Sequence, residues 1–172
     1  MIIPRSFYAK DTLIVAEKLL GCTIHADRDG VITAARIIET EAYCGTADLA
    51  CHASRGKTPR TEVMFGEPGF AYVYMIYGMY FCLNFVTEKE GNACAVLLRG
   101  IETTDGRKIY GPGKSCRYLK IDKSFNRLDL CSKETIWLER GAKHKVMFKT
   151  DRRVGIDYAG DWKDKQWRFI ML

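Results

Sequence analysis

Helical spacing of apolar residues occurs in only a few short parts of the chain. In the stretch 11–21, Asp11 can cap the first turn, apolar residues recur every three or four positions, and Gly21 can end the helix. Capping residues predict further short helices, two of which start with a proline at the first helical position. These further helices are expected at 46–54, 58–66 and 111–121.

Strict alternation of apolar and polar residues is more common and predicts strands. The stretch 27–30 has the composition of a turn, and 71–86 is typical of a hairpin that turns at Tyr77 and Gly78. Residues 124–130 have no clear period. Strands are expected at 22–27, at 31–43, in both arms of 71–86, and at 93–102, 135–140, 145–149 and 167–172. Mostly antiparallel strands with few helices predict an α+β fold.

Length and composition are those of one globular domain, expected to span residues 1–172. The chain is 47% hydrophobic and 28% charged, which is enough apolar material for a substantial core. No apolar run approaches the roughly 18 residues of a membrane span, so no membrane partner is expected. The first ten residues lack the pattern of a signal peptide, which favours a cytoplasmic protein.

The seven cysteines and the net charge restrict the chemistry only in part. An odd number of cysteines with no C-x-x-C pair predicts buried thiols rather than disulfides or a metal site. No cofactor is expected either. The net charge of +6 is concentrated in the later two thirds of the chain. It is compatible with a nucleic-acid partner and equally with a solvated basic face.

The strand expected at 31–43 carries two carboxylates on one face. Alternation puts Glu39, Glu41 and Tyr43 together with Ile37, and turns their neighbours to the opposite face. A carboxylate beside an aromatic ring suits a general base that acts on water. A glutamate on an exposed edge strand would show the same pattern, and alternation does not choose between Glu39 and Glu41.

Two residues of the expected hairpin are hard to explain by packing alone. Tyr77 lies in the turn, where a large ring is exposed unless something covers it. An apolar side chain that projects in this way can enter a DNA base step and help to extrude a base. Asn84 interrupts an apolar run, so its amide is either satisfied within the core or faces a pocket.

Several familiar motifs are excluded. The stretch 111–115, GPGKS, lacks a P-loop because Lys108 stands where the motif needs a glycine, although Lys114 in the first turn of a helix could still bind a phosphate. No G-x-S-x-G turn or dinucleotide-binding glycine loop is present. His25 and His144 occur in polar contexts and are interpreted as incidental.

Taken together, these segments resemble the alkyladenine (3-methyladenine) DNA glycosylase family. The resemblance rests on "FYAKDTLIVAEKLLG", "AVLLRGIE", "GPGKSC", "RRVGIDYAGDWKDKQWRF" and above all the long block from Arg36 to Phe85, in order from residue 7 to residue 169. It implies a curved, mostly antiparallel sheet with short helices around it and a protruding β-hairpin. It also implies a base-excision repair enzyme that flips out alkylated or deaminated purines.

Site residues follow from the resemblance at the matching positions. It implies that Glu41 is the general base and that Arg99 and the Val154 carbonyl help to hold the attacking water. Tyr77 would fill the vacated stack. The base pocket would be walled by Tyr43, His52, Tyr74, Asn84 and Leu97, with Asn84 crowding the guanine 2-amino group. Contacts to the DNA backbone are expected at Arg60, Met79 and Lys114, and also at His52.

The expected reaction is hydrolysis of the N-glycosidic bond, which releases the free base and leaves an abasic site. A purine alkylated at N3 or N7 is cationic and already weakly bonded to its sugar, and stacking against tyrosines favours a cation. No lysine nucleophile is evident, so a monofunctional enzyme without strand cleavage is expected. Its partner would be double-stranded DNA with damaged purines, bound by a monomer that is nucleoid-associated in a prokaryote and nuclear in a eukaryote.

Two alternatives stay open at this point. One is a non-catalytic protein that binds damaged DNA, and it would bind without releasing base. The other is an enzyme for free nucleosides, whose affinity would depend little on salt, whereas binding through several phosphates falls steeply as salt rises.

Overall fold

One long strand, β2 (Val31–Cys44), organises the sheet of the computed structural model, which describes residues 1–141 and 146–172. β2 pairs with β5 along most of its length, with β1 at its start and with β9 near its end. The main path of the sheet runs β3-β4-β5-β2-β1-β7, with β6 on β5 and β8 on β9. Every strand pair in the described part of the chain is antiparallel, as the sequence predicted.

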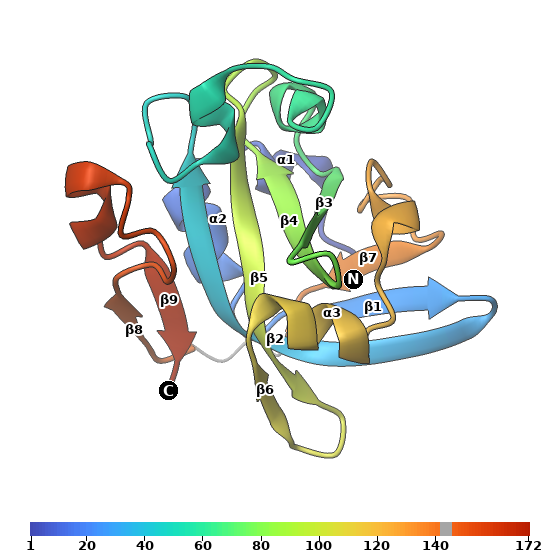
Figure 1. Ribbon diagram of the computed structural model, residues 1–172. Helices are drawn as coiled ribbons and strands as arrows, with labels where there is room; N and C mark the ends of the chain where they lie inside the picture. Colours follow the sequence, from blue (N-terminus) through green and yellow to red (C-terminus); the bar gives the residue numbers. More distant parts are fainter. Residues whose placement is uncertain (142–145) are drawn as a thin grey trace.

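The sheet curls, and short helices lie on both of its sides (Figure 1). α1 (Arg5–Tyr8) and α2 (Thr12–Lys18) lie behind it, and α3 (Pro112–Tyr118) lies in front of it, against β4 and β5. The other strands are β1 (Thr23–Arg28), β3 (Ala71–Ile76), β4 (Tyr80–Thr87), β5 (Cys94–Thr103), β6 (Lys108–Tyr110), β7 (Ile136–Glu139), β8 (Phe148–Asp151) and β9 (Arg168–Met171). This is the predicted α+β domain.

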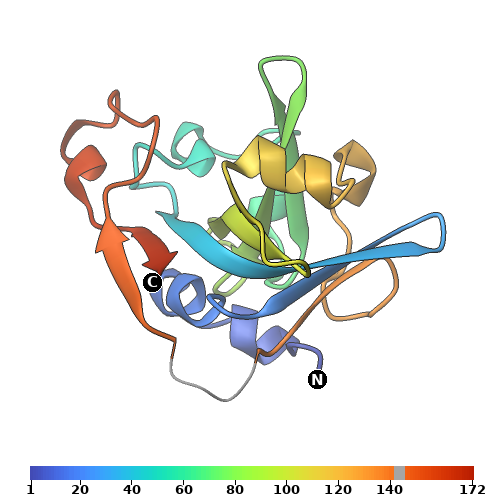
Figure 2. The same cartoon turned by 90° about the horizontal axis from the view of Figure 1, so that it is seen from below.

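The β3–β4 hairpin projects from the body of the protein, as expected for a protruding hairpin (Figure 2). Tyr77 and Gly78 form its turn with φ angles of 52° and 66°. The left-handed region is unfavourable for a tyrosine, so this turn is strained at Tyr77. The paired arms of β3 and β4 hold it in place.

Helix α2 forms where the sequence predicted a helix. The Asp11 carboxylate accepts the N–H groups of Leu13 and Ile14, as an N-cap should. The helix ends at Lys18, before Gly21, which has a φ of 82° in the following turn. Helix α3 also matches, with Pro112 as its first residue.

Two predicted helices are largely absent. Residues 46–54 contain only the start of the 3₁₀ helix η1 (His52–Arg55), and 58–66 contain only η2 (Glu62–Phe65). In the first stretch the Asp48 carboxylate accepts the N–H groups of Cys44 and Ala50 and pairs with Arg153, which holds a turn at this point. In the second stretch the Thr58 hydroxyl accepts the N–H of Thr61, as predicted for a cap, but the chain continues as a turn and η2 begins only at Glu62.

Other boundaries differ in detail. Sequence reasoning missed α1 and β6, which are too short for a periodic signal. Segment 124–130 is irregular as expected, apart from the end of η3 (Lys123–Phe125). A strand was expected at 145–149, and the observed strand β8 begins at Phe148. Lys145 and His144 lie outside the described residues. The last 3₁₀ helix is η4 (Gly160–Asp164).

A pair of β-bulges corrects one prediction about β2. Between Ile37 and Glu39 the chain advances by two residues while β5 advances by one, from Ile101 to Gly100. The extra residue reverses the alternation, so Ile37 packs in the main core with Ala42 rather than beside Glu41. β5 compensates immediately, because Arg99 is the extra residue between Gly100 and Leu98.

The main core lies between the sheet and the helices and includes Leu98 of β5, which is fully buried. We predict that Leu98→Ala lowers the free energy of unfolding by about 3 kcal/mol, because truncation leaves a cavity in close-packed surroundings. Urea denaturation would measure the change. Val31→Ala is the control, since Val31 is 55% exposed and its truncation should change stability by less than about 0.5 kcal/mol. Equal effects of the two substitutions would contradict the assigned core.

Candidate active site

A cavity of about 330 Å³ opens on the face of the sheet that carries Glu41. Residues from neighbouring strands form its floor, because Glu41 pairs with Leu97, Leu97 with Asn84, and Asn84 with Tyr72. These four lie in one row across β2, β5, β4 and β3, and all line the cavity. The pairing register therefore brings together residues that are far apart in the sequence.

Glu41 lies at one side of this cavity and is fully buried. One of its oxygens accepts the Tyr43 hydroxyl at 2.8 Å, and the other accepts the backbone N–H of Val154 at 2.8 Å. Arg99 Nε lies 3.5 Å from the second oxygen. Burial raises the pKa of Glu41, while Arg99, the Val154 N–H and the Tyr43 hydroxyl oppose that rise by favouring the charged form.

The structure distinguishes the two carboxylates that the sequence pattern left equivalent. Glu39 is also buried, but both its contacts are with cations: Arg99 Nε at 3.2 Å and Arg168 Nη1 at 3.0 Å. Glu41 lines the cavity, and Glu39 is not among the described residues that do so. Glu39 therefore holds Arg99 in place beside Glu41, and Glu41 is the carboxylate that faces the space.

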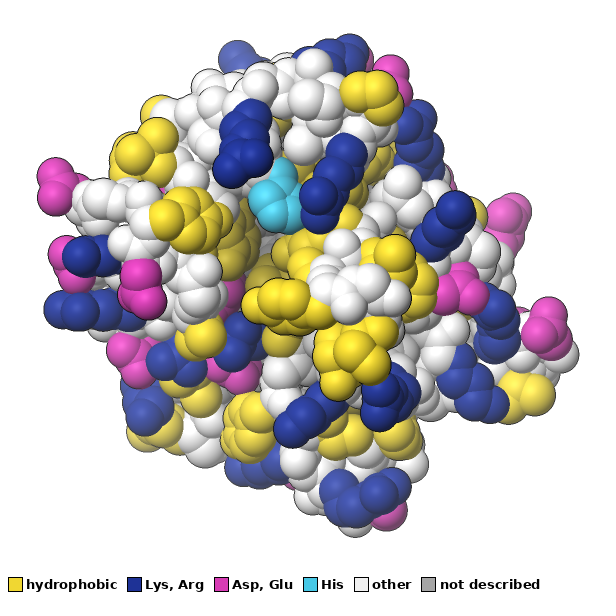
Figure 3. Space-filling model, viewed as in Figure 1, with side chains coloured by type: hydrophobic (Ala, Val, Ile, Leu, Met, Phe, Trp, Pro, Cys, Tyr) yellow, Lys and Arg dark blue, Asp and Glu magenta, His cyan; other side chains and the backbone are white. Residues whose placement is uncertain are grey.

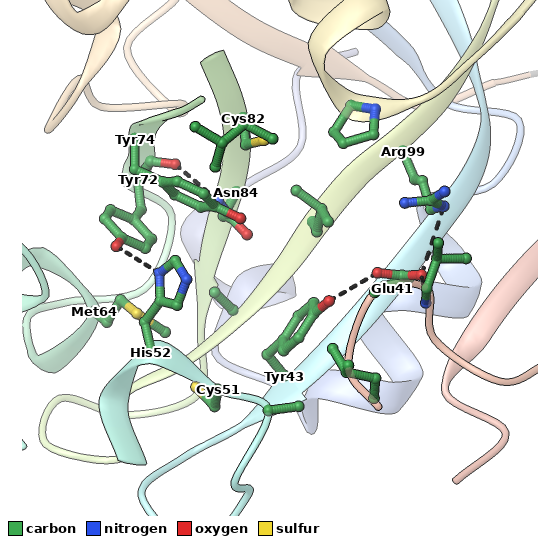
Figure 4. Close-up of a pocket in the computed structure, with 18 of the residues that line it drawn as sticks. Glu41, Tyr43, Cys51, His52, Met64, Tyr72, Tyr74, Cys82, Asn84 and Arg99 are labelled. Carbon is green, nitrogen blue, oxygen red and sulfur yellow. Dashed lines mark hydrogen bonds and ion pairs between the residues drawn. The ribbon is translucent and has the colours of Figure 1, made fainter. Parts of the chain in front are cut away.

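Aromatic side chains wall the opposite side of the cavity (Figure 4). His52 and Tyr74 meet edge to face with ring centroids 4.5 Å apart, and His52 Nδ1 lies 3.0 Å from the Tyr72 hydroxyl. Tyr43 extends between this group and Glu41, toward which its hydroxyl points. Burial lowers the pKa of His52 to about 4, and nearby Arg60 and Arg55 act in the same direction.

The Asn84 amide is fixed rather than free to rotate. Its side-chain nitrogen donates to the Tyr72 carbonyl at 3.2 Å, and the residue is buried while lining the cavity. The alternatives weighed from the sequence, a satisfied core amide and a pocket residue, are therefore both correct. Leu97 lies next to Asn84 on the floor.

The residues expected to contact DNA lie on the outer surface. Tyr77 is 87% exposed and lies at the mouth of the cavity, and Met79 is 60% exposed on the same turn. The exposed Arg60 guanidinium lies over the Tyr74 ring at 5.2 Å and lines a second cavity of about 640 Å³ beside the first. Lys114 is exposed on the first turn of α3, away from the cavity lining described here. Figure 3 shows basic and hydrophobic side chains around the hollow on this face.

Sequence reasoning missed several residues of the site. Tyr72 looked like an ordinary cross-strand aromatic, although its place two residues before Tyr74 on one strand predicts that both face the same way. Arg168 and Arg153 gave no signal, since they act through contacts with segments more than a hundred positions away. Tyr158 lines both cavities and is 68% exposed, and no motif pointed to it.

Comparison with known proteins identifies relatives over nearly the whole chain. A protein from Desulfitobacterium hafniense is 44% identical, with 97% of this chain and 93% of the relative aligned. One from Methanocella arvoryzae is 44% identical over 98% of this chain and 91% of its own, and one from Rickettsia felis is 43% identical over 99% and 93%. Each bears the name "Putative 3-methyladenine DNA glycosylase".

A family model also matches the chain, over residues 6–172, and its description is methylpurine-DNA glycosylase. This match includes every residue of the cavity described above. Within the described residues, no helix is long and apolar enough to cross a membrane. The family match and the relatives together show that the chain belongs to the methylpurine-DNA glycosylase family of DNA repair enzymes.

Proposed function

We propose that this protein releases alkylated or deaminated purines from double-stranded DNA by hydrolysing the N-glycosidic bond with a water that Glu41 activates. The observation that carries the proposal is a fully buried carboxylate at one side of a cavity that has aromatic rings on its opposite side. A carboxylate in such a site can take a proton from water and stabilise an oxocarbenium-like sugar. The products are the free base and an abasic site.

The contacts of Glu41 support its role as the base. Arg99, Tyr43 and the Val154 N–H all favour the ionised form, which is the form that can accept a proton. Both carboxylate oxygens keep further lone pairs after these bonds. We propose that the attacking water binds one of them, with the Val154 carbonyl and Arg99 as its other partners.

The aromatic wall supports selection of damaged purines. A purine alkylated at N3 or N7 carries a positive charge, and electron-rich rings attract cations. Tyr43 and Tyr74 would stack on the flipped base together with His52. Because burial keeps the pKa of His52 at about 4, its ring is neutral near pH 7 and does not repel a cationic base. We propose that Asn84 and Leu97 crowd a guanine 2-amino group.

The exposed hairpin supports base flipping. Tyr77 is 87% exposed at the mouth of the cavity, in the turn of the projecting β3–β4 hairpin. We propose that it enters the base stack and fills the space that the flipped nucleotide leaves. Met79, Arg60 and Lys114 would then contact the backbone, along with His52.

We also propose that the enzyme is a monofunctional monomer that does not cleave the strand. Strand cleavage by a glycosylase uses an amine nucleophile in the base pocket, and none of the described residues that line the cavity is a lysine. Glu41 would therefore deliver water rather than form a covalent link.

The role of Glu41 predicts a separation of binding from chemistry. Glu41→Gln should retain affinity for damaged DNA and lose excision by about a hundredfold or more, because the amide keeps the shape but cannot accept the proton. Release of free base from an oligonucleotide with one hypoxanthine or one 7-methylguanine would measure it. Glu102→Gln on β5 is the control and should excise normally. Equal activity of Glu41→Gln and the native protein would refute the assignment, and binding without excision by the native protein would indicate a non-catalytic damage binder.

The role of Tyr77 predicts weaker capture of the flipped nucleotide. Tyr77→Ala should leave thermal stability unchanged, since the ring is exposed, and raise the Kd for lesion-bearing duplex by about tenfold, because roughly 1 to 3 kcal/mol of stacking is lost. Fluorescence of 2-aminopurine next to the lesion would report flipping. Val31→Ala, at the start of β2, serves as control. Unchanged affinity and flipping would exclude the wedge.

The neutral state of His52 gives a third prediction. The His52 imidazole should titrate with a pKa of about 4, followed through its C2 proton by NMR. Arg60→Gln should raise this pKa, because Arg60 is one of the cations that disfavour protonation. A native pKa near 6.5 would mean that the ring is charged during catalysis at mildly acidic pH and would contradict a cation-binding wall.

A further inference from the structure

Arg153 and Asp48 form an ion pair that has no solvent exposure. The bond is bidentate, with Arg153 Nη1 2.5 Å and Nη2 2.9 Å from the two oxygens of Asp48. The same nitrogens donate to the carbonyls of Ala42 at 3.0 Å and Trp162 at 3.2 Å. One guanidinium thus connects the end of β2, the loop before His52 and the helix η4.

The guanidinium also supports an active-site ring from behind. Its central carbon lies 4.8 Å from the centre of the Tyr43 ring and 5.0 Å from that of Trp167. Tyr43 lines the cavity, whereas Arg153 is not among the described residues that line it. The arginine therefore contacts Tyr43 without being able to touch a base or a water in the cavity.

Both uncharged donors to Glu41 lie next to this arginine. Tyr43, which Arg153 contacts through its ring, gives the hydroxyl bond at 2.8 Å. Val154, the next residue along the chain from Arg153, gives the N–H bond at 2.8 Å. Fixing Arg153 by its four hydrogen bonds therefore fixes both donors with respect to the two oxygens of one carboxylate.

Stability is a poor explanation for this pair. Removing two charges from water carries a large desolvation penalty, and replacing a buried ion pair by apolar residues of similar volume is often neutral or stabilising. The planar guanidinium has hydrogen-bond donors at defined angles. The ion pair therefore fixes the directions of its hydrogen bonds, which an apolar pair cannot do.

We propose that Arg153 is a positioning residue of the active site, which holds the Tyr43 hydroxyl and the Val154 N–H on Glu41 through its pair with Asp48. The inference rests on the proposed function for its effect on catalysis, but the geometry of Glu41 can be tested without catalysis.

The charge around Glu41 must stay constant in such a test. Arg99, which belongs to β5, has its Nε 3.5 Å from a Glu41 oxygen. Glu39 of β2 is paired with Arg168 of β9. The other titratable groups that face Glu41 or influence it are Tyr43, Tyr74, Cys82 and Arg153 itself. A substitution that keeps the positive charge at position 153 preserves its electrostatic interaction with Glu41 and changes chiefly the positions of the donors.

Arg153→Lys is the first variant, since it keeps the charge and loses the planar fork. The pKa of Glu41 would be measured from the carboxyl ¹³C shift of labelled glutamate. We expect it to rise by about one pH unit, because an ionised carboxylate that loses hydrogen-bond donors is easier to protonate. Arg28→Lys is the control, because Arg28 has a similar partner in Asp122 but lies at the surface. It should leave the pKa of Glu41 unchanged.

The double variant Arg153→Met with Asp48→Asn removes both charges and keeps the net charge of the pair at zero. It should raise the pKa of Glu41 in the same direction and move the acid limb of the excision rate to higher pH, since Glu41 must be ionised to accept a proton. If both variants fold and the pKa of Glu41 in each equals that of the native protein, the proposal is overturned. It is also overturned if neither variant folds, because the pair would then be a requirement of the fold. Absence of excision by the native protein would overturn the proposed function, and the ¹³C titration would still decide the positioning role.

Discussion

The site depends on the ionised state of one buried carboxylate. Removal of Glu41 from water favours its protonated form, and a protonated carboxyl cannot act as a base. Three donors from separate parts of the chain oppose this preference: the guanidinium of Arg99 from β5, the N–H of Val154 from the loop after β8, and the hydroxyl of Tyr43 from β2 itself. The fold brings these three donors together.

The arrangement explains why so many buried charges surround a small cavity. Arg99 needs Glu39 as a partner, Glu39 also takes Arg168, and the two uncharged donors are held by Arg153 and its partner Asp48. Each of these charges would be unfavourable alone, but each is paired. The opposite wall carries tyrosine rings and His52, whose low pKa keeps its ring neutral near pH 7.

Much of the fold and part of the site could be predicted from local pattern. Alternation correctly put Glu41 and Tyr43 on one face, and a turn at Tyr77 and Gly78 was evident from composition. In place of the helices expected at 46–54 and 58–66 the chain forms turns and short 3₁₀ helices, although Thr58 does accept the N–H of Thr61 as a cap would. Asp48 binds Arg153, a contact that the local sequence does not indicate. Contacts such as Val154 with Glu41 join residues 113 positions apart, and no local period encodes them.

The paired bulges at Ile38 and Arg99 have a consequence for how β2 can vary. They divide β2 into an outer half, which pairs with β1, and an inner half, which carries Glu41, and the inward-facing positions of the two halves are out of phase. The outer half can therefore pair with β1 without setting the orientation of the inner half. Substitutions in the outer half therefore need not change the orientation of the half that carries Glu41. A single extra residue in each strand thus separates the orientation of Glu41 from that of the β1–β2 hairpin.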